Sequence, residues 1–392
     1  MLTGHNMIYF GDYWDGVRRN RQQLMTVFAR HNKVLYIVKE PYLRPTLAGL
    51  GQGELTWSDL CSSPVRQVAE NLYVFRYPLW ASASGHFPLK QLAREARRRT
   101  LKKALRELDM SQPIVWFYHP RWVDMLGEIP SARLRLYHVI DEYTSYQGKT
   151  ASRCRQIEEQ EKTMLARVDA VIVVSKELYE AKRRFNPNTY LVPNGVNYQA
   201  YSDALADPHV PEVLQAIKSP RLGYSGLIAD KLNLAMLKDL AQETPEWSLV
   251  LLGPVNVSKQ AETWQALQAM PNVYYLGSVE SAQVPYYVKG FDVGLMPYAQ
   301  DRHSETISPL KLYDYLAAGL PIAAMDIPAT REFSSYIHLA SAPQDFSQAV
   351  RDALADVTLE RRQARREIAL QNTWEARVEQ LSHLIQSQLI AR

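Results

Sequence analysis

The segment from residue 301 to residue 321, DRHSETISPLKLYDYLAAGLP, contains residue types that can bind a phosphorylated ligand. Ser308 is a good N-cap and Pro309 suits the first helical position, whereas Gly319 is typical of a helix end. The free backbone N–H groups in the first turn of such a helix, together with its dipole, favour an anion. The pattern therefore predicts a helix whose N-terminus binds a negatively charged group.

Two charged side chains on this helix extend the prediction. Lys311 stands in the first turn, where a cation opposes the helix dipole unless a phosphate lies between them. Asp314 follows three residues later on the same helix face. Together they suit a nucleoside diphosphate, with its phosphates at the helix N-terminus and a ribose hydroxyl on Asp314. A capped surface helix with an incidental lysine–aspartate pair explains the spacing equally well.

Further candidates follow the predicted strands, because ligands of open parallel sheets bind at the carboxyl ends of strands. His119 comes after the apolar run 113–118, and Asp141 comes after the run 134–140. A carboxylate or a histidine at such a position can take a proton from a bound hydroxyl, so Asp141 is a candidate base. The alternative for Asp141 is a simple turn cap, and a lone histidine such as His119 is more often structural than acceptor-orienting.

The loop GDYWDGVRR, residues 11–19, places two glycines and two arginines at a strand-to-helix turn. We take Trp14, Arg18 and Arg19 as acceptor-binding candidates, because the two guanidinium groups suit an acceptor phosphate. A solvated arginine pair fits the loop equally well.

Composition and charge restrict the class of protein. Lys plus Arg number 45 and Asp plus Glu 41, and the net charge of +4 is too weak to indicate a nucleic-acid partner. The two cysteines, Cys61 and Cys154, suit a reducing compartment, and no Cys/His cluster has metal-ligand spacing. The N-terminus lacks the pattern of a signal peptide, and the longest nearly apolar stretch, 316–325, has about half the length of a membrane span. We expect a cytoplasmic protein and leave a peripheral membrane association open.

Short β-branched and aromatic runs alternate with amphipathic stretches along the 392 residues. Runs that are apolar at every position, such as AVIVV at 170–174, predict parallel strands covered on both faces. The alternation predicts an α/β protein with doubly wound sheets. It breaks at the irregular stretch 194–219 and then restarts. The sequence therefore predicts two Rossmann-like domains facing across a cleft, 1–200 and 201–370, and a C-terminal helix, 371–392, that packs back towards the first domain.

The predicted elements can be written as two series. Strands are expected at 7–10, 33–38, 72–76, 113–118, 134–140, 170–174 and 189–192, and then at 221–224, 247–252, 272–276, 291–296 and 321–324. Helices are expected at 17–31, 88–108, 152–167 and 176–185, then at 232–243, 257–269, 282–289, 309–318 and 344–356, and as one long or broken helix over 359–392.

Several of these segments resemble one family. SPLKLYDYLAAGLPIAAMDIP resembles the C-terminal signature of GT-B glycosyltransferases of the group-1 (family 4) type. DAVIVVSKEL followed by YLVPNGVNYQAYS resembles the end of the N-terminal domain in those enzymes, and VYYLGSVESAQVPYYVKGFDVGLMPY resembles their nucleotide-base region. The opening, GDYWDGVRRNRQQLMTVFARHNKVLYI, resembles the first βαβ unit of bacterial polysaccharide glycosyltransferases. The similarity covers nearly the whole chain and implies the GT-B fold.

The resemblance implies a nucleotide-sugar donor, a UDP-sugar by preference, held mainly by the C-terminal domain. Asp314 falls where the family has the second acid of its paired-glutamate motif, but Thr306 stands at the first position, with Glu305 beside it. This departure puts the usual retaining mechanism in doubt. Gly226 and Lys231 fall where the family has a glycine turn and a basic phosphate contact. The donor-binding set is Gly226, Lys231, Gly277, Ser278, Thr306, Ser308, Pro309, Leu310, Lys311 and Asp314.

The catalytic set also draws on a resemblance. LRLYHVIDEYTSY is similar to the corresponding region of the inverting glucuronosyltransferase of xanthan synthesis, which implies that Asp141 is the base. Its neighbour Glu142 is the weaker candidate, and Glu305 and His119 complete the catalytic set. No D-x-D motif is present, which fits leaving-group stabilisation by the helix and Lys311 without a metal or other cofactor.

The predicted activity is transfer of a sugar to a glycan or polyprenyl-linked acceptor in cell-surface polysaccharide biosynthesis. Two alternatives remain: another GT-B activity such as a sugar-nucleotide epimerase, and a non-catalytic nucleotide- or glycan-binding protein on the same scaffold. A nicotinamide dehydrogenase is excluded because no G-x-G-x-x-G follows a strand, and a nucleic-acid protein would need more than one basic stretch.

The one basic stretch lies within the predicted helix 88–108. Residues 94–106, REARRRTLKKALR, hold seven basic side chains and one acid, and Trp80 and Phe87 precede them. A basic helix with an apolar side can lie on an anionic bilayer at the inner face of the cell membrane. A core-packed helix with a solvated basic face is the alternative.

Overall fold

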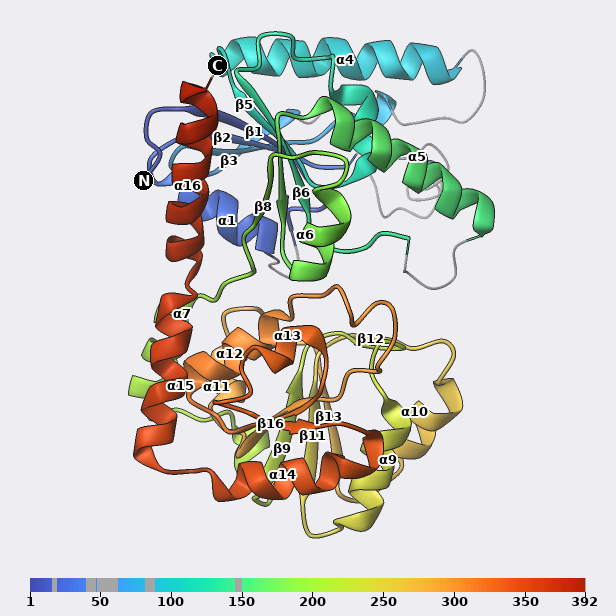
Figure 1. Cartoon of the computed structure of the whole chain (residues 1–392), viewed down its shortest axis with the longest axis vertical. Helices are drawn as coiled ribbons and strands as arrows, with labels where there is room; N and C mark the ends of the chain where they lie inside the picture. Colours follow the sequence, from blue (N-terminus) through green and yellow to red (C-terminus); the bar gives the residue numbers. More distant parts are fainter. Residues whose placement is uncertain (16–19, 40–46, 48–62, 82–88, 145–149, 392) are drawn as a thin grey trace. The chain divides into compact units, whose positions relative to one another are not determined.

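The chain folds into two compact units (Figure 1). The structure is a computed structural model that describes all residues except 16–19, 40–46, 48–62, 82–88, 145–149 and 392. The first unit comprises Met1–Val173, Leu178–Val192 and Val378–Arg392, and the second comprises Val174–Glu177 and Pro193–Arg377. The main boundary thus lies at residues 192–193 rather than at 200, and the second unit extends to Arg377 rather than to 370.

Eight strands among the described residues form the sheet of the first unit, in the order β3-β4-β2-β1-β5-β6-β7-β8. All neighbours are parallel except β3 and β4. The order reverses between β1 and β5, which is where such sheets bind ligands. The strands are β1 (Asn6–Phe10), β2 (Lys33–Ile37), β3 (Val65–Ala69), β4 (Leu72–Phe75), β5 (Ile114–Phe117), β6 (Leu134–Val139), β7 (Ala170–Val173) and β8 (Thr189–Leu191).

Helices lie on both faces of this sheet, as the reversed strand order requires (Figure 1). They are α1 (Asn20–Ala29), α4 (Leu89–Glu107), α5 (Ala151–Arg167), most of α6 (Lys176–Lys182) and most of α16 (Trp374–Ile390), with the short helices η1 (Leu79–Ala81) and η2 (Pro120–Met125). Strands β1, β2, β5 and β7 are buried almost throughout, because helices cover them on both sides.

The second unit holds a fully parallel sheet of six described strands in the order β13-β11-β9-β14-β15-β16. They are β9 (Arg221–Ser225), β11 (Ser248–Leu252), β13 (Val273–Gly277), β14 (Val293–Met296), β15 (Ile322–Met325) and β16 (His338–Ala340), and β10 (Ile228–Ala229) pairs separately with β12 (Val255–Asn256). The helices are α7 (Tyr198–Ala206), α8 (Glu212–Gln215), α9 (Leu234–Glu243), α10 (Ala261–Gln268), α11 (Val284–Val288), α12 (Leu310–Ala318), α13 (Pro328–Arg331), α14 (Phe346–Ala355), α15 (Leu359–Gln371) and the short η3 (Pro343–Asp345). The predicted α/β class with doubly wound parallel sheets is confirmed.

The helical C-terminal stretch is broken, because its backbone pairs with a distant residue. Helix α15 ends at Gln371, and α16 begins at Trp374. Between them the Val196 N–H donates to the Asn372 carbonyl at 3.0 Å, and the Trp374 N–H donates to the Val196 carbonyl at 3.1 Å. Beyond the break, the chain from Val378 onward belongs to the first unit. None of the helices in the described part of the chain is long and apolar enough to cross a membrane.

Candidate functional site

Helix α12 is the helix predicted from the 301–321 segment, and its two ends differ in how well they were predicted. It begins at Leu310 with Pro309 as N-cap, so the predicted capping role of Ser308 is wrong. The Ser308 hydroxyl instead accepts the backbone N–H of Asn194 at 3.3 Å, and the Ser308 carbonyl accepts the Asn194 side-chain amide at 2.7 Å. The helix ends as predicted at Gly319, which has a left-handed conformation with φ 73°. No side chain caps the first turn of α12.

Lys311 is a buried cation in that first turn, only 8% exposed. Its Nζ donates to the hydroxyl of Tyr298 at 3.1 Å and lies 5.0 Å from the ring centre of Tyr224. No salt bridge joins Lys311 to a carboxylate in the described part of the chain. Burial lowers its pKa to about 8, against the opposing attraction of Asp314. The Tyr298 hydroxyl does not neutralise the buried ammonium of Lys311, so a bound anion would stabilise it.

Two glycines bring backbone close to Lys311. Gly226 follows β9 with φ +136°, and a Cβ there would lie 3.0 Å from the Lys311 Nζ. Gly253 follows β11 with φ +133°, and a Cβ there would lie 2.2 Å from the Gly226 carbonyl oxygen. Only glycine fits both positions without displacing a neighbour. The structure therefore brings the predicted donor residues Gly226 and Lys311 together at the carboxyl ends of neighbouring strands.

Lys231 belongs to the same group of loops. Its carbonyl accepts the Ala299 N–H at 2.9 Å, and the next residue, Leu232, pairs with Tyr298 in an isolated β-bridge. Tyr298 is also the residue that accepts the hydrogen bond from Lys311. The backbone next to Lys231 thus pairs with the backbone of Tyr298, whose side chain Lys311 contacts, although the two lysines lie eighty residues apart in the sequence.

Asp314 has a partner that the sequence pattern did not indicate. It lies on α12, which packs against α7, and it shares a hydrogen bond with the Tyr201 hydroxyl of that helix. Burial raises the pKa of Asp314 to about 6, whereas the bond from Tyr201 and the nearby Lys311 act in the opposite direction. The Asp314 carboxyl group therefore takes up a proton more readily than an exposed aspartic acid does.

The remaining donor candidates lie at the end of β13 and in other loops of the second unit. Gly277 ends β13 with φ +70°, and its carbonyl accepts the Gly253 N–H at 2.7 Å, whereas Ser278 is exposed. Thr306 donates its hydroxyl to the His303 carbonyl at 3.2 Å. Glu305 is exposed in the turn that precedes α12.

The catalytic candidates of the first unit follow β5 and β6. Asp141 is partly exposed two residues beyond the end of β6. His119 is buried, and its Nδ1 accepts the Arg121 N–H at 3.0 Å as the N-cap of η2. The His119 ring lies 4.3 Å from the ring of Tyr143, whose hydroxyl donates to the Tyr118 carbonyl. Contacts of Tyr143 with Tyr118 and His119 thus join the ends of β5 and β6, and His119 caps η2.

The acceptor candidates are only partly described. Arg18 and Arg19 lie outside the described residues, and the ring centres of Trp14 and Tyr36 lie 4.9 Å apart in an edge-on arrangement. Arg21 was missed: it is 4% exposed and its guanidinium lies 4.6 Å above the ring of Tyr118. The signal was present, because Arg21 shares helical spacing with the apolar residues Leu24, Met25 and Phe28 of α1.

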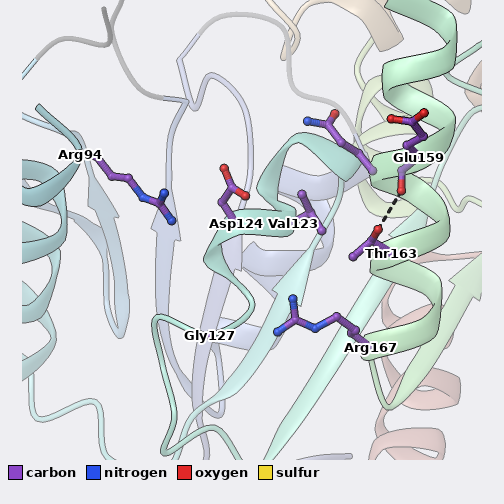
Figure 2. Close-up of a pocket in the computed structure, with 8 residues that line it drawn as sticks. Arg94, Val123, Asp124, Gly127, Glu159, Thr163 and Arg167 are labelled. Carbon is purple, nitrogen blue, oxygen red and sulfur yellow. Dashed lines mark hydrogen bonds between the residues drawn. The ribbon is translucent and has the colours of Figure 1, made fainter. Parts of the chain in front are cut away.

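The first unit also has an open hollow of about 470 Å³ bordered by α4, η2 and α5 (Figure 2). Arg94 and Arg167 line it together with Asp124 and Glu159, so its wall carries both signs of charge. The Thr163 hydroxyl, which also lines it, donates to the Glu159 carbonyl at 2.9 Å. None of the predicted site residues lies on this wall.

The fold is that of GT-B glycosyltransferases. The sucrose-phosphate synthase of Thermosynechococcus elongatus matches with a TM-score of 0.70 at 16% identity over 99% of this chain and 100% of that chain. WaaG, a glycosyltransferase involved in lipopolysaccharide biosynthesis, matches with a TM-score of 0.63 at 13% identity over 97% and 99%. The catalytic domain of starch synthase IV from Arabidopsis thaliana matches with a TM-score of 0.69 at 12% identity over 100% of both chains.

The family model "Glycosyl transferases group 1" matches residues 223–356 of this chain. This range contains every predicted donor residue from Gly226 to Asp314. TuaH of Bacillus subtilis (strain 168), whose name assigns it to glycosyl transfer in teichuronic acid biosynthesis, is 30% identical over 235 residues. The match covers 57% of this chain and 58% of TuaH, little more than half of each.

Proposed function

We propose that this protein is a glycosyltransferase that moves a hexosyl group from a UDP-sugar to a glycan or lipid-linked acceptor in cell-surface polysaccharide biosynthesis. The observation that carries the proposal is Lys311, a buried cation in the first turn of α12. It lies against Gly226, inside the range that the group 1 family model matches. In the solved structures, a trehalose-6-phosphate protein of E. coli holds UDP-2-fluoro glucose, and starch synthase IV holds ADP.

The chemistry asked of the second unit is stabilisation of a leaving group. When the bond between the anomeric carbon and the diphosphate oxygen breaks, the electron pair stays on the diphosphate and its negative charge grows. The Lys311 ammonium and the uncapped N–H groups of α12 are fixed donors for that charge. We infer that these groups stabilise the negative charge of the leaving diphosphate, which a metal ion does in other transferases.

The chemistry asked of the first unit is activation of the acceptor. The acceptor hydroxyl oxygen forms the new bond to the anomeric carbon, and its proton passes to the carboxylate of Asp141. A base-assisted single displacement inverts the anomeric carbon, so the configuration of the product, read by NMR, tests this mechanism.

Helix α4 supports a membrane-linked acceptor. One side packs in the core through Leu101 and Ala104, whereas Leu92 is 66% exposed. Trp80 of η1, which packs against α4, is 61% exposed. The exposed cations are Arg94, Arg98, Arg99, Lys102, Lys103 and Arg106, and the predicted partner Phe87 lies outside the described residues. We infer that α4 rests on an anionic bilayer at the inner face of the cell membrane, where basic side chains and interfacial aromatics are favoured.

A direct experiment tests the proposed function. The protein is incubated with UDP, ADP and GDP and with their glucose or mannose derivatives, and melting temperature and nucleoside diphosphate release are followed. We expect one nucleotide to raise the melting temperature, and its sugar derivative to be cleaved. A protein that binds none of these nucleotides would contradict the proposal.

A further inference from the structure

A buried chain of polar groups lies under the loop that follows β6. Tyr137 of β6 donates its hydroxyl to Glu161 of α5 at 3.0 Å. Lys182, the last residue of α6, donates its Nζ to Glu161 at 2.9 Å and to Glu142 at 2.9 Å. Thr144 donates its hydroxyl to the second oxygen of Glu142 at 2.8 Å. These five residues, the Lys182 network, join a strand and two helices to the loop.

The charged groups of this network are buried, so each depends on its partners to stay ionised. The side chains of Lys182, Glu161 and Glu142 are 7%, 8% and 14% exposed. Burial disfavours ionised Glu142, but Lys182 and Thr144 outweigh it and lower its pKa, whereas at Glu161 burial prevails and raises the pKa. The two carboxyl groups in turn outweigh the burial of Lys182 and raise its pKa. Lys182 therefore stays charged and holds Glu142 in its ionised form.

The network fixes the residue next to the candidate base. Glu142 follows Asp141 directly, and the next residue, Tyr143, is tied to the end of β5 through the Tyr118 carbonyl. Moving the loop would leave Glu142 or Lys182 buried without its partner, which is strongly destabilising. Replacing a buried ion pair by apolar side chains of similar volume is often neutral for stability, so we infer that the charges here serve the geometry of the loop.

We propose that Lys182 is a positioning residue for the sugar-transfer reaction: by holding Glu142, it sets where the carboxylate of Asp141 lies when it takes the acceptor proton. The inference rests on the proposed function and on the role of Asp141 in it. We take Lys182 to act through these carboxylates rather than on a substrate, because its side chain is 7% exposed and its ammonium donates to both of them.

The test compares three variants on turnover of UDP-glucose, or of the sugar nucleotide selected by the binding screen. Lys182→Met should lower kcat by about 10- to 100-fold and leave the donor KM within about twofold, because transition-state geometry is lost and donor contacts are not. Arg183→Met is the matched control: it removes the next cation, which is 52% exposed, and should change neither constant. Thr144→Val removes one bond to Glu142 and should give a smaller loss of kcat, which keeps the test available if Lys182→Met does not fold.

A double mutant distinguishes positioning from a general loss of stability. If Lys182 acts through Asp141, adding Lys182→Met to Asp141→Asn should lower kcat no further. Losses that multiply, or an equal rise of donor KM in Lys182→Met, would overturn the inference. An Asp141→Asn variant with unchanged kcat would remove the base and this inference together, while the nucleotide screen would still decide on the transferase function separately.

Discussion

The pKa of Lys311 predicts that nucleoside diphosphate binding weakens between pH 7 and pH 9. Burial lowers it to about 8 in the free protein, so the ammonium is present at pH 7 and mostly lost at pH 9. A diphosphate needs the charged form, and binding at pH 9 must first protonate the lysine. Because pH 9 lies one unit above the pKa, protonating Lys311 lowers the affinity for the diphosphate by roughly a factor of 10 relative to pH 7.

The variant Lys311→Met keeps the apolar stem and removes the charge. The proposed contact between Lys311 and a phosphate would be a hydrogen bond between charged groups, which contributes about 1.5–3 kcal/mol. The variant should therefore bind the nucleotide about 10- to 150-fold more weakly at pH 7. It should also lose the weakening between pH 7 and pH 9, because the titrating group is gone.

Unfolding of the free protein supplies an independent check on the same group. Because the pKa falls from 10.5 in the unfolded chain to about 8 in the folded one, the unfolded state binds more protons between these values. The contribution of Lys311 is unfavourable below pH 8, and stability should rise with pH across that window. Lys311→Met should remove this rise.

The assay is isothermal calorimetry at pH 7, 8 and 9 with the nucleoside diphosphate chosen by the binding screen. Lys218→Met, which removes an exposed lysine of the second unit, is the control and should bind like the wild type at each pH. A wild-type affinity that stays constant from pH 7 to pH 9, or a Lys311→Met variant with wild-type affinity, would refute the reasoning.

Four shorter predictions follow. Gly226→Ala should weaken nucleotide binding at least about tenfold in a folded protein, because its Cβ displaces the Lys311 ammonium at 3.0 Å and its φ of +136° is strained; calorimetry measures this. Asp141→Asn should lower kcat by roughly 100-fold or more with unchanged donor affinity in steady-state kinetics. Lys102→Glu with Lys103→Glu should release the protein from anionic vesicles in co-sedimentation, since each cation near the surface contributes about 1 kcal/mol. Addition of EDTA should leave the transfer rate unchanged, because Lys311 and α12 are inferred to stabilise the leaving group.

The sequence predicts those strands and helix ends whose structure depends on neighbouring residues in the chain. A run such as AVIVV leads to β7 because it is apolar at every position, and Gly319 ends α12 because a glycine takes the left-handed conformation easily. Strand β3 was missed because its residues, VRQVA, are mostly exposed at the edge of the sheet. Local pattern thus predicts the elements whose burial and ends are decided by their own residues.

The miss at Ser308 and the position of the break in the C-terminal helical stretch share a different cause, which is a partner far away in the sequence. Ser308 does not cap α12, because Asn194 binds it across 114 positions. The C-terminal helical stretch breaks where Val196 pairs with the backbone on either side of Thr373. No spacing rule within a single helix or loop contains these contacts, so they become visible only once the sheets are assembled.

The candidate donor site shows how the two kinds of information combine. The sequence placed Lys311 and Asp314 on one helix face, and the simplest outcome was an ion pair that neutralises both. In the fold each takes a tyrosine instead: Lys311 donates to Tyr298, and Asp314 bonds to Tyr201 of α7. A tyrosine hydroxyl satisfies hydrogen bonding without cancelling charge, so the buried Lys311 keeps an ammonium that a bound anion would stabilise further. These two tyrosine bonds favour a binding site over a structural pair, and they depend on Tyr298 and Tyr201, which lie outside α12.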